Sequence, residues 1–385
     1  MQDSASEQTV SAETLELPPR QTRLEEFWSQ LRKNRMSLMG LLIFVVFFFI
    51  ALAGLFLTAG PKPILDPSLV RLEEKLRPPL SRAKLEDLAP EEIPPLGRYL
   101  LGTDELGRDV FARMLQGAWV SLTVGFVAVG IAVIIGVILG GLSGYYGENP
   151  VRLGQVAIVF LLFLGVVNWS ILPSGLPIVL VIASIGLAVI MVLRRKKQSQ
   201  GPLAFMDAQL LSVDILITGL IDIMLCFPSF FLILTVVALL PASIYNIMIV
   251  IGLTSWMGAA RFVRAEFLSL REQDFVTAAR ALGVSDWRII FRHMVPNAIA
   301  PVLVSATIGI AGAILTEAGL SFLGFGVPPP HATWGNILSD GKNYLFDAPW
   351  LTFIPGIAIL VVVLSFNLFG EGLRDILNPK LRERH

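Results

Sequence analysis

Several uninterrupted apolar runs in this sequence are long enough to cross a membrane. Residues 37–57 form the first, and a helix needs about 20 residues to span the hydrocarbon layer of a bilayer. Further runs occupy 118–140, 215–240, 242–260, 298–315 and 351–369. Because backbone in lipid must satisfy its own hydrogen bonds, each run is predicted to be a helix. The sequence therefore predicts an all-α polytopic membrane protein with six core spans.

The composition agrees with a chain that is not surrounded by water alone. Hydrophobic residues make up 54% of it and charged residues only 16%, which is more apolar than one soluble core requires. Thirty basic residues balance thirty acidic ones, so net charge gives no reason to expect a nucleic-acid partner. The single cysteine, Cys226, lies in an apolar run and excludes an intramolecular disulfide. With only three histidines besides, we expect no metal, no cofactor and a buried, inert Cys226.

The polar stretches divide the chain into regions. Residues 1–36 are predicted to be a cytoplasmic tail that ends in an amphipathic elbow helix on the membrane surface. The first transmembrane helix covers 37–59, and the Pro-rich segment 60–117 lies outside the bilayer on the extracytoplasmic side. The remaining spans fall within 118–376. Residues 377–385 form a cytoplasmic C-terminal tail.

An additional apolar hairpin is predicted between the second and third core spans, within 152–209. Its arms are 157–172 and 176–193, and they are separated by Pro173, Ser174 and Gly175. Arg152 precedes the hairpin and four basic residues at 194–197 follow it, so both ends are expected in the cytoplasm. Two more spans would raise the total to about eight. The alternative is a re-entrant or surface-lying hairpin, because the first arm is short and contains Asn168.

Basic clusters set the expected orientation. They lie at 32–35, 194–197, 261–292 and 374–384, all on one side of the membrane if the spans are counted as above. The positive-inside rule places that side in the cytoplasm. Both termini of this multi-pass protein are then cytoplasmic.

The polar segment 266–297 between two spans carries the most specific pattern. Phe275, Ala278, Ala279 and Leu282 stand at helical spacing and form one apolar face, which Thr277 and Arg280 flank. Gly283 ends this helix, and Ser285 caps a second short helix with an apolar face of its own. That second face consists of Trp287, Ile290, Phe291 and Met294. On periodicity alone, the pair could equally rest on lipid.

The order Thr277-Ala278-Ala279, Gly283 and Val295-Pro296 resembles the Glu-Ala-Ala loop of permease subunits in ATP-binding-cassette importers. Five blocks resemble the C-type permeases of the dipeptide, oligopeptide and nickel uptake family: residues 101–109, 144–147, 280–283, 292–297 and 316–326. Two departures stand out. Thr277 replaces the glutamate of the family, and 152–209 has no counterpart in it.

The resemblance implies a six-helix type I importer core in a bacterial inner membrane. In that family the loop forms a coupling helix that docks on the ATPase, so segment 261–295 is expected to make this contact. The expected ATPase-coupling residues are Phe275, Thr277, Ala278, Ala279, Arg280, Leu282, Gly283, Ser285 and Arg288. The implied partners are a second permease, two cytoplasmic ATP-binding subunits and an extracytoplasmic substrate-binding protein, with membrane lipid around the spans.

The chain itself shows no phosphate-binding loop, because Gly341-Lys342 continues with Asn343 and Asn336 stands where the loop needs its first glycine. The implied cargo is peptides or related small solutes, and the sequence does not say which. The alternative is an ion-coupled secondary transporter, which would favour inverted repeats and broken helices. A membrane-embedded enzyme would need a catalytic constellation that the sequence does not offer.

Two acidic residues fall within or beside apolar runs. Ionised Asp222 and Glu317 are costly there unless each faces a cavity or a partner. A place on the transport pathway and a packing role between helices both fit these residues.

Overall fold

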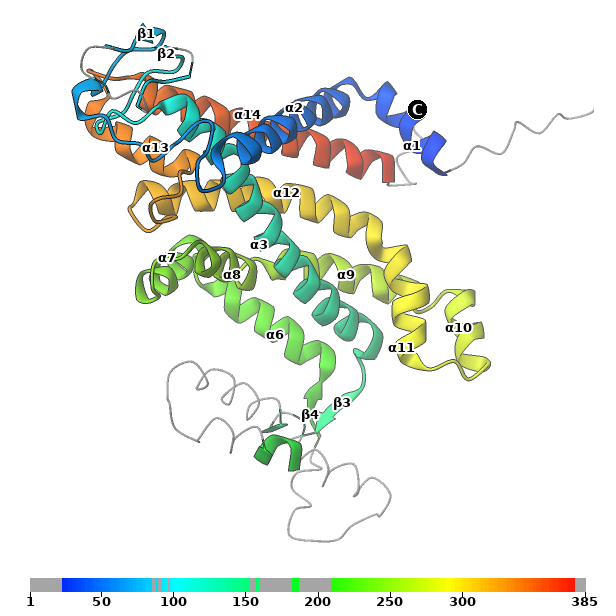
Figure 1. Ribbon diagram of the computed structural model, residues 1–385. Coiled ribbons are helices and arrows are strands. Elements are labelled where there is room, and N and C mark those ends of the chain that lie inside the picture. The colour runs from blue at the N-terminus through cyan, green and yellow to red at the C-terminus, as the bar shows by residue number, and fades with distance from the viewer. Residues whose placement is uncertain are drawn as a thin grey trace, which may run out of the picture.

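The computed structural model describes residues 23–84, 88, 92–95, 97–152, 155, 157–158, 182–186 and 209–377. Within these ranges the chain is mostly helical, which confirms the predicted class (Figure 1). Five helices are long and apolar enough to cross a membrane, and a bent pair makes six if it counts as one span. Most of the predicted hairpin in 152–209 lies outside the described residues, so the total of eight spans stays a prediction.

The spans are continuous helices or helix pairs. They are α2 (Arg35–Thr58), α3 (Val110–Tyr146), α6 (Val213–Cys226) with α7 (Ser229–Leu239), α8 (Ile244–Leu253) with α9 (Trp256–Leu270), α12 (Val295–Phe322) and α14 (Trp350–Leu377). Short elements connect or flank them: α1 (Arg23–Lys33), α10 (Asp274–Ala281), α11 (Asp286–Arg288), the π-helix η3 (Ile289–Met294) and α13 (Trp334–Gly341). Two 3₁₀ turns, η1 (Leu72–Glu74) and η4 (Lys342–Tyr344), also occur among the described residues.

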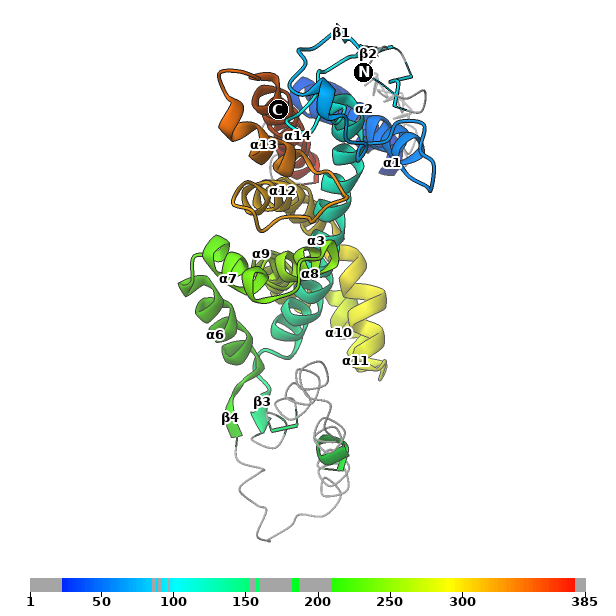
Figure 2. The same ribbon diagram turned by 60° about the vertical axis from the view of Figure 1, so that its left-hand side comes forward.

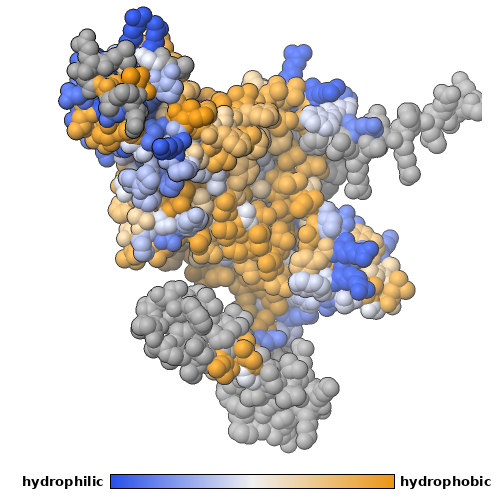
Figure 3. Space-filling view, in the orientation of Figure 1, coloured by the Kyte–Doolittle hydropathy of each residue, from blue (hydrophilic) through white to orange (hydrophobic). Residues whose placement is uncertain are grey.

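The apolar surface of the molecule forms a band. Large apolar side chains of α2 such as Phe49 and Phe56 are exposed, as are those of α6, α12 and α14. Figure 3 shows this band between two polar ends of the molecule. A surface of this kind is stable when lipid or another protein covers it, as expected for membrane-spanning helices.

A seam of glycines brings α3 and α9 into close contact. Gly136, Gly140 and Gly144 repeat every fourth residue on α3 and face α9. A Cβ atom on Gly136 would lie 2.6 Å from the Cβ of Ala259, and one on Gly144 would lie 2.5 Å from the Cβ of Phe267. At Gly140 it would meet the backbone carbonyl of Ala260. Small residues at this repeat let two helix backbones approach closely, which is a common way to hold membrane helices together.

The segment before α3 folds over one end of the bundle. It contains the antiparallel pair of β1 (Ser81–Arg82) and β2 (Arg98–Tyr99), which lies at the same end of the molecule as α13 (Figure 2). Asp109 caps α3 by accepting the N–H of Phe111 at 2.9 Å. The helix therefore begins before the apolar run at 118 and continues past its end at 140.

The predicted span 215–240 is wrong as a single helix. The chain bends by 82° between α6 and α7, at Phe227 and Pro228. Proline disfavours helical backbone in the residue before it, which accounts for the break. Cys226, expected to be buried, is exposed at this bend.

The two ends of the 152–209 region are brought together by a short ribbon. β3 (Pro150–Arg152) pairs antiparallel with β4 (Gln209–Ser212), with Pro150 opposite Ser212 and Val151 opposite Leu211. The chain therefore leaves the bundle after α3 and re-enters it before α6 at one place.

Candidate coupling surface

The segment between α9 and α12 forms two short helices around a glycine. Gly283 has a φ of +72°. Its N–H donates to the carbonyl of Arg280 at 2.9 Å, and the N–H of Val284 donates to the carbonyl of Ala279 at 3.1 Å. This turn closes the end of α10 in the left-handed conformation that glycine adopts most readily. The predicted helix end at Gly283 is confirmed.

The inner face of this segment packs on the chain itself. Val276 and Ala279 of α10 are buried in one cluster with Ile289 and Met294 of η3 and with Phe267 of α9. The prediction that Ala279 shares a face with Phe275 and Leu282 is therefore wrong, and so is the prediction that Ile290 and Met294 share a face with Trp287. Residues spaced by three and four positions define a stripe, but the sequence alone does not show how wide it is or where its edges fall.

The outer face carries an apolar patch formed by Phe275, Leu282, Trp287 and Phe291. Leu282 is 83% exposed and Trp287 71% exposed, and the other two side chains are exposed as well. The rings of Trp287 and Phe291 lie against each other with centroids 4.0 Å apart. Thr277, Ala278, Arg280, Ser285 and Arg288 are also at the surface. Of the expected coupling residues, the structure thus places all but Ala279 on an accessible face.

Asp286 ties this segment to the end of α3. Its carboxylate accepts the hydroxyl of Tyr145 at 2.7 Å and that of Tyr146 at 3.1 Å. The Arg280 guanidinium lies 4.7 Å above the Tyr145 ring and its Nε is 3.4 Å from the phenolic oxygen. Arg280 is thus engaged within the chain, so its assignment to the ATPase contact rests on its remaining exposed surface.

A second link joins the same region through Arg271. Its guanidinium contacts Glu148 at 3.0 Å and Glu272 at 2.9 Å, and the hydrogen bond to Glu148 raises the pKa of Arg271 above its ordinary value. Sequence reasoning missed the roles of Asp286, Tyr145 and Tyr146. The Gly-Tyr-Tyr-Gly block at 144–147 was the available signal, but it does not indicate which residue the two hydroxyls contact.

The two acidic residues of the spans differ in setting. Glu317 is fully buried and accepts the hydroxyl of Ser321 within α12 at 2.6 Å. It also accepts the hydroxyl of Ser121 at 3.3 Å, which joins α12 to α3. This environment fits a packing role. Asp222 instead lies at the surface of α6, where its carboxylate contacts Arg261 of α9 at 2.9 Å.

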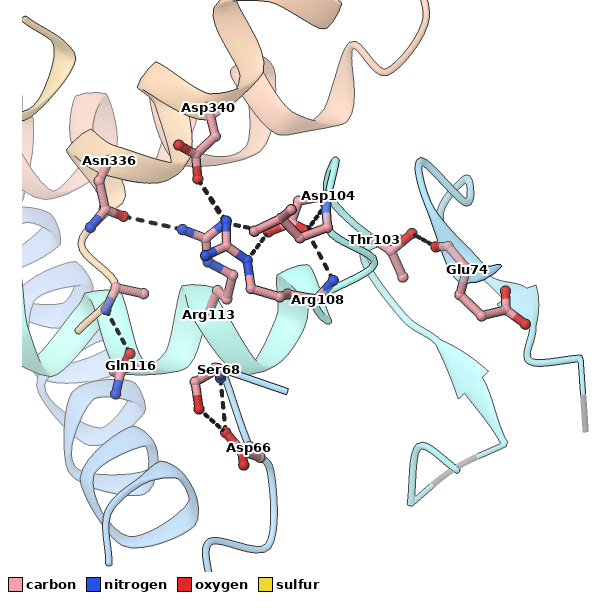
Figure 4. A network of polar contacts seen from close by, with 12 residues as sticks. Asp66, Ser68, Glu74, Thr103, Asp104, Arg108, Arg113, Gln116, Asn336 and Asp340 are labelled. Atoms are coloured by element: carbon pink, nitrogen blue, oxygen red, sulfur yellow. Dashed lines mark hydrogen bonds and ion pairs between the residues drawn. The ribbon is translucent and has the colours of Figure 1, made fainter. Parts of the chain in front are cut away.

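A network of charged residues holds the opposite end of α3 (Figure 4). The carboxylate of Asp104 contacts the guanidinium groups of Arg113 and Arg108. Asp340 of α13 contacts the same two guanidinium groups, at 2.9 Å and 3.1 Å. Gln116 of α3 accepts the N–H of Ala332 at 2.6 Å. The block at 101–109 thus fixes the end of α3 to the connection between α12 and α14.

Gly283 gives a direct test of the turn. Gly283→Val is expected to destabilise the segment by about 1–2 kcal/mol, because a β-branched residue is strained at positive φ. Gly283→Asn should be nearly neutral, because asparagine tolerates this conformation and the added Cβ would meet nothing within 4 Å. Hydrogen exchange of α10 in the purified protein would measure the difference. Equal protection in the two variants would contradict the importance of the left-handed turn.

Comparison with known proteins agrees with this arrangement. Residues 201–383 match the family described as binding-protein-dependent transport system inner membrane component, and residues 22–78 match the N-terminal transmembrane domain of oligopeptide transport permease C. These two regions include segment 261–295 and the first span, α2.

Relatives match over nearly the whole chain. The dipeptide transport system permease protein DppC of Alkalihalophilus pseudofirmus is 34% identical, over 93% of this chain and 90% of that protein. The di/tripeptide transport system permease protein DppC of Pseudomonas aeruginosa is 33% identical, over 93% of each chain. The oligopeptide transport system permease protein OppC of Bacillus subtilis is 30% identical, over 91% of this chain and 88% of that protein.

These matches give no support to the ion-coupled alternative, in spite of the break between α6 and α7. The family consists of transport components, and ATP hydrolysis belongs to separate subunits. The assignment rests on the polytopic helical bundle, on the exposed helix pair around Gly283 and on the matches at both ends of the chain. The chain belongs to the binding-protein-dependent transport family of inner-membrane permeases, in the C-type peptide permease branch.

Proposed function

We propose that this chain and a second permease form the pathway of an ATP-driven peptide importer, and that the apolar patch of Phe275, Leu282, Trp287 and Phe291 docks into a groove on an ATP-binding subunit. The observation that carries the docking proposal is the high exposure of Leu282 and Trp287 on a segment whose other face is packed on α3 and α9. Two helices that present anchors to a groove are a common mode of protein recognition.

Charged residues around this patch distinguish it from the surface that faces lipid. The segment carries Asp274, Arg280, Asp286 and Arg288 at its surface. In Figure 3 its polar surface lies beside the apolar band, at the end of the molecule away from β1 and β2. An apolar centre with a polar rim is typical of a protein interface. The patch is therefore better suited to a protein groove than to the interior of the bilayer.

The partners and the direction follow from the family and from the charges. A binding protein would deliver the cargo on the extracytoplasmic side, where 60–117 lies in this proposal. Two ATP-binding subunits would lie on the cytoplasmic side, together with both termini and the coupling segment. The names of the relatives support peptides as the cargo class. Closure of the ATP-binding subunits would move the coupling segment, and α3 would carry this motion into the spans.

The docking proposal is tested with Leu282→Asp combined with Trp287→Asp. We expect the ATP-binding subunits to be lost from the purified complex, with association weakened roughly a hundredfold or more, because burial of each of the two side chains contributes about 1.5–3 kcal/mol. The measurement is co-purification of the subunits, together with ATP-dependent peptide uptake from the same membranes.

The matched control is Phe346→Asp. Phe346 is an exposed apolar residue between α13 and α14, at the other end of the bundle. Its replacement should leave the ATP-binding subunits bound. Full retention of these subunits and of uptake in the Leu282 and Trp287 variant would show instead that the patch rests on lipid or on nothing.

A further inference from the structure

Three unusual features lie on one exposed face of α6. The carboxylate of Asp222 contacts Nη2 of Arg261 at 2.9 Å, and these side chains are 68% and 55% exposed. Cys226 is exposed one turn further along the same face. The helix then ends at Phe227 and Pro228, which are also exposed.

This face lies within the membrane-spanning part of the bundle. A second ion pair, Asp214 with Arg264, joins α6 and α9 at the end of α6 near β4. Asp222 follows Asp214 by eight residues, which is about 12 Å along a helix. The whole of α6 has 14 residues, or about 21 Å, so its end at Cys226 lies inside a layer of about 30 Å.

Contact with lipid is unfavourable for both the ion pair and the helix break. An ionised pair in hydrocarbon is costly, and such residues in membrane proteins face a partner or a water-filled cavity. A break in the helix at this depth leaves backbone groups that lipid cannot hydrogen-bond, and breaks are tolerated where they line a cavity or are buried in protein. The exposed ion pair and the exposed break are independent observations, and both indicate that water reaches this face or that protein covers it.

Two glycines keep the space around the ion pair open. Gly219 precedes Asp222 by one turn on α6, and Gly258 precedes Arg261 by one turn on α9. A Cβ atom on either glycine would meet none of the described residues within 4 Å. Glycine inside a helix costs roughly 1 kcal/mol relative to alanine, and packing among the described residues does not require it at these two positions.

We propose that the face of Asp222, Arg261 and Cys226 lines a water-filled section of the translocation pathway. There the ion pair opens, and each of its two side chains binds one of the terminal charges of a passing peptide. This inference rests on the proposed function and adds a site to it. A peptide with free ends carries an ammonium group that suits Asp222 and a carboxylate that suits Arg261. The pair opens at little cost because both groups are already more than half exposed.

The Asp214–Arg264 pair offers a structural contrast. It is bidentate, with contacts of 2.5 Å and 2.6 Å, and Asp214 also accepts the hydroxyl of Ser143 from α3. Both side chains are about a quarter to a third exposed. This pair joins three helices and is expected to hold them together, whereas the Asp222–Arg261 pair joins two helices by one contact.

The natural cysteine makes the water-filled surface directly testable. The complete transporter in membrane vesicles is treated either with a permanently charged methanethiosulfonate or with a lipid-soluble maleimide, and Cys226 is followed by peptide mass. We expect the charged reagent to modify Cys226, and saturating peptide to slow the reaction. Modification by the lipid-soluble reagent alone would show a lipid-facing surface, and no modification by either would show a surface covered by protein. Either result overturns the inference.

The role of the charges is tested in the same complex. Asp222→Asn with Arg261→Gln is expected to lower peptide uptake roughly tenfold or more, the loss that accompanies removal of charge-assisted contacts. The exchanged pair, Asp222→Arg with Arg261→Asp, should recover most of the uptake. Asp214→Asn should instead lower the yield of assembled complex. Unchanged uptake in the Asp222→Asn, Arg261→Gln variant overturns this inference and leaves the proposed function standing. A wild-type complex that takes up no peptide overturns the proposed function as well.

Discussion

A Gly140→Leu variant is expected to lose the assembled transporter. Gly140 faces the backbone carbonyl of Ala260, and a Cβ atom would lie only 3.0 Å from the Ala260 carbonyl carbon. The neighbour is main chain of α9, which cannot rotate away as a side chain would. Excess volume in a packed contact costs 1–3 kcal/mol even where side chains can adjust, so about 3 kcal/mol or more is expected here. The two helices would have to separate along the seam of Gly136, Gly140 and Gly144.

The same helix provides a control for this variant. Gly130 is exposed on α3, and a Cβ atom there would meet nothing within 4 Å. Leucine favours the helix more than glycine does, and at position 130 it would not clash with α9. The transporter with Gly130→Leu should therefore assemble normally. Detergent-extracted complex would be followed by size-exclusion chromatography and by thermal unfolding. Normal yield and stability of Gly140→Leu would contradict the close contact between α3 and α9.

Arg113→Met is the second variant with a large expected effect. The Arg113 side chain is almost fully buried and contacts both Asp104, which is fully buried, and Asp340. Its removal leaves the buried carboxylate of Asp104 with Arg108 and two backbone N–H groups. Loss of one partner from a buried ion pair typically lowers the free energy of unfolding by about 3–5 kcal/mol. Because Asp104 keeps its other contacts, we expect a loss of about 3 kcal/mol. The segment before α3 should then detach from α13.

An exposed arginine of the same segment serves for comparison. Arg98 of β2 lies at the surface, and Arg98→Met should change stability by less than about 0.5 kcal/mol. Limited proteolysis of the segment between α2 and α3 would report on its attachment, together with the thermal unfolding of the complex. A segment equally resistant in both variants would show that the network of Figure 4 does not hold it.

Much of the fold was predictable because hydrophobic length is a physical requirement of the bilayer. Runs such as 37–57 and 351–369 correspond to α2 and α14, although both helices extend past the apolar residues. The bend after Cys226 was missed because the run 215–240 is apolar on both sides of Pro228. Proline inside α12 and α14 leaves those helices unbroken, so the residue type alone does not decide between a bend and a straight span.

The two short helices around Gly283 were predictable in their position but not in detail. The turn at Gly283 follows from one residue type, whereas the burial of Ala279 depends on Phe267 and Met294, which are distant in sequence or belong to another element. The partners of Asp286 were beyond prediction for the same reason, since Tyr145 precedes it by more than a hundred residues. Hydrophobic periodicity predicts that one face of a helix is apolar, but it does not identify the residues that pack against that face.

The length of α3 has a mechanical consequence. Its 37 residues form one continuous helix, a rod of about 56 Å. One end is clamped by Arg113 and Gln116, the other by Tyr145 and Tyr146, and the glycine seam lies between its middle and the second end. Such a rod behaves as a lever whose fulcrum is nearer to the segment around Gly283 than to the charged network. A tilt of about 5° around Gly140, the centre of the seam, moves the long arm of about 45 Å roughly five times as far as the short arm of about 9 Å, so a small displacement at Asp286 becomes a larger one at Asp340.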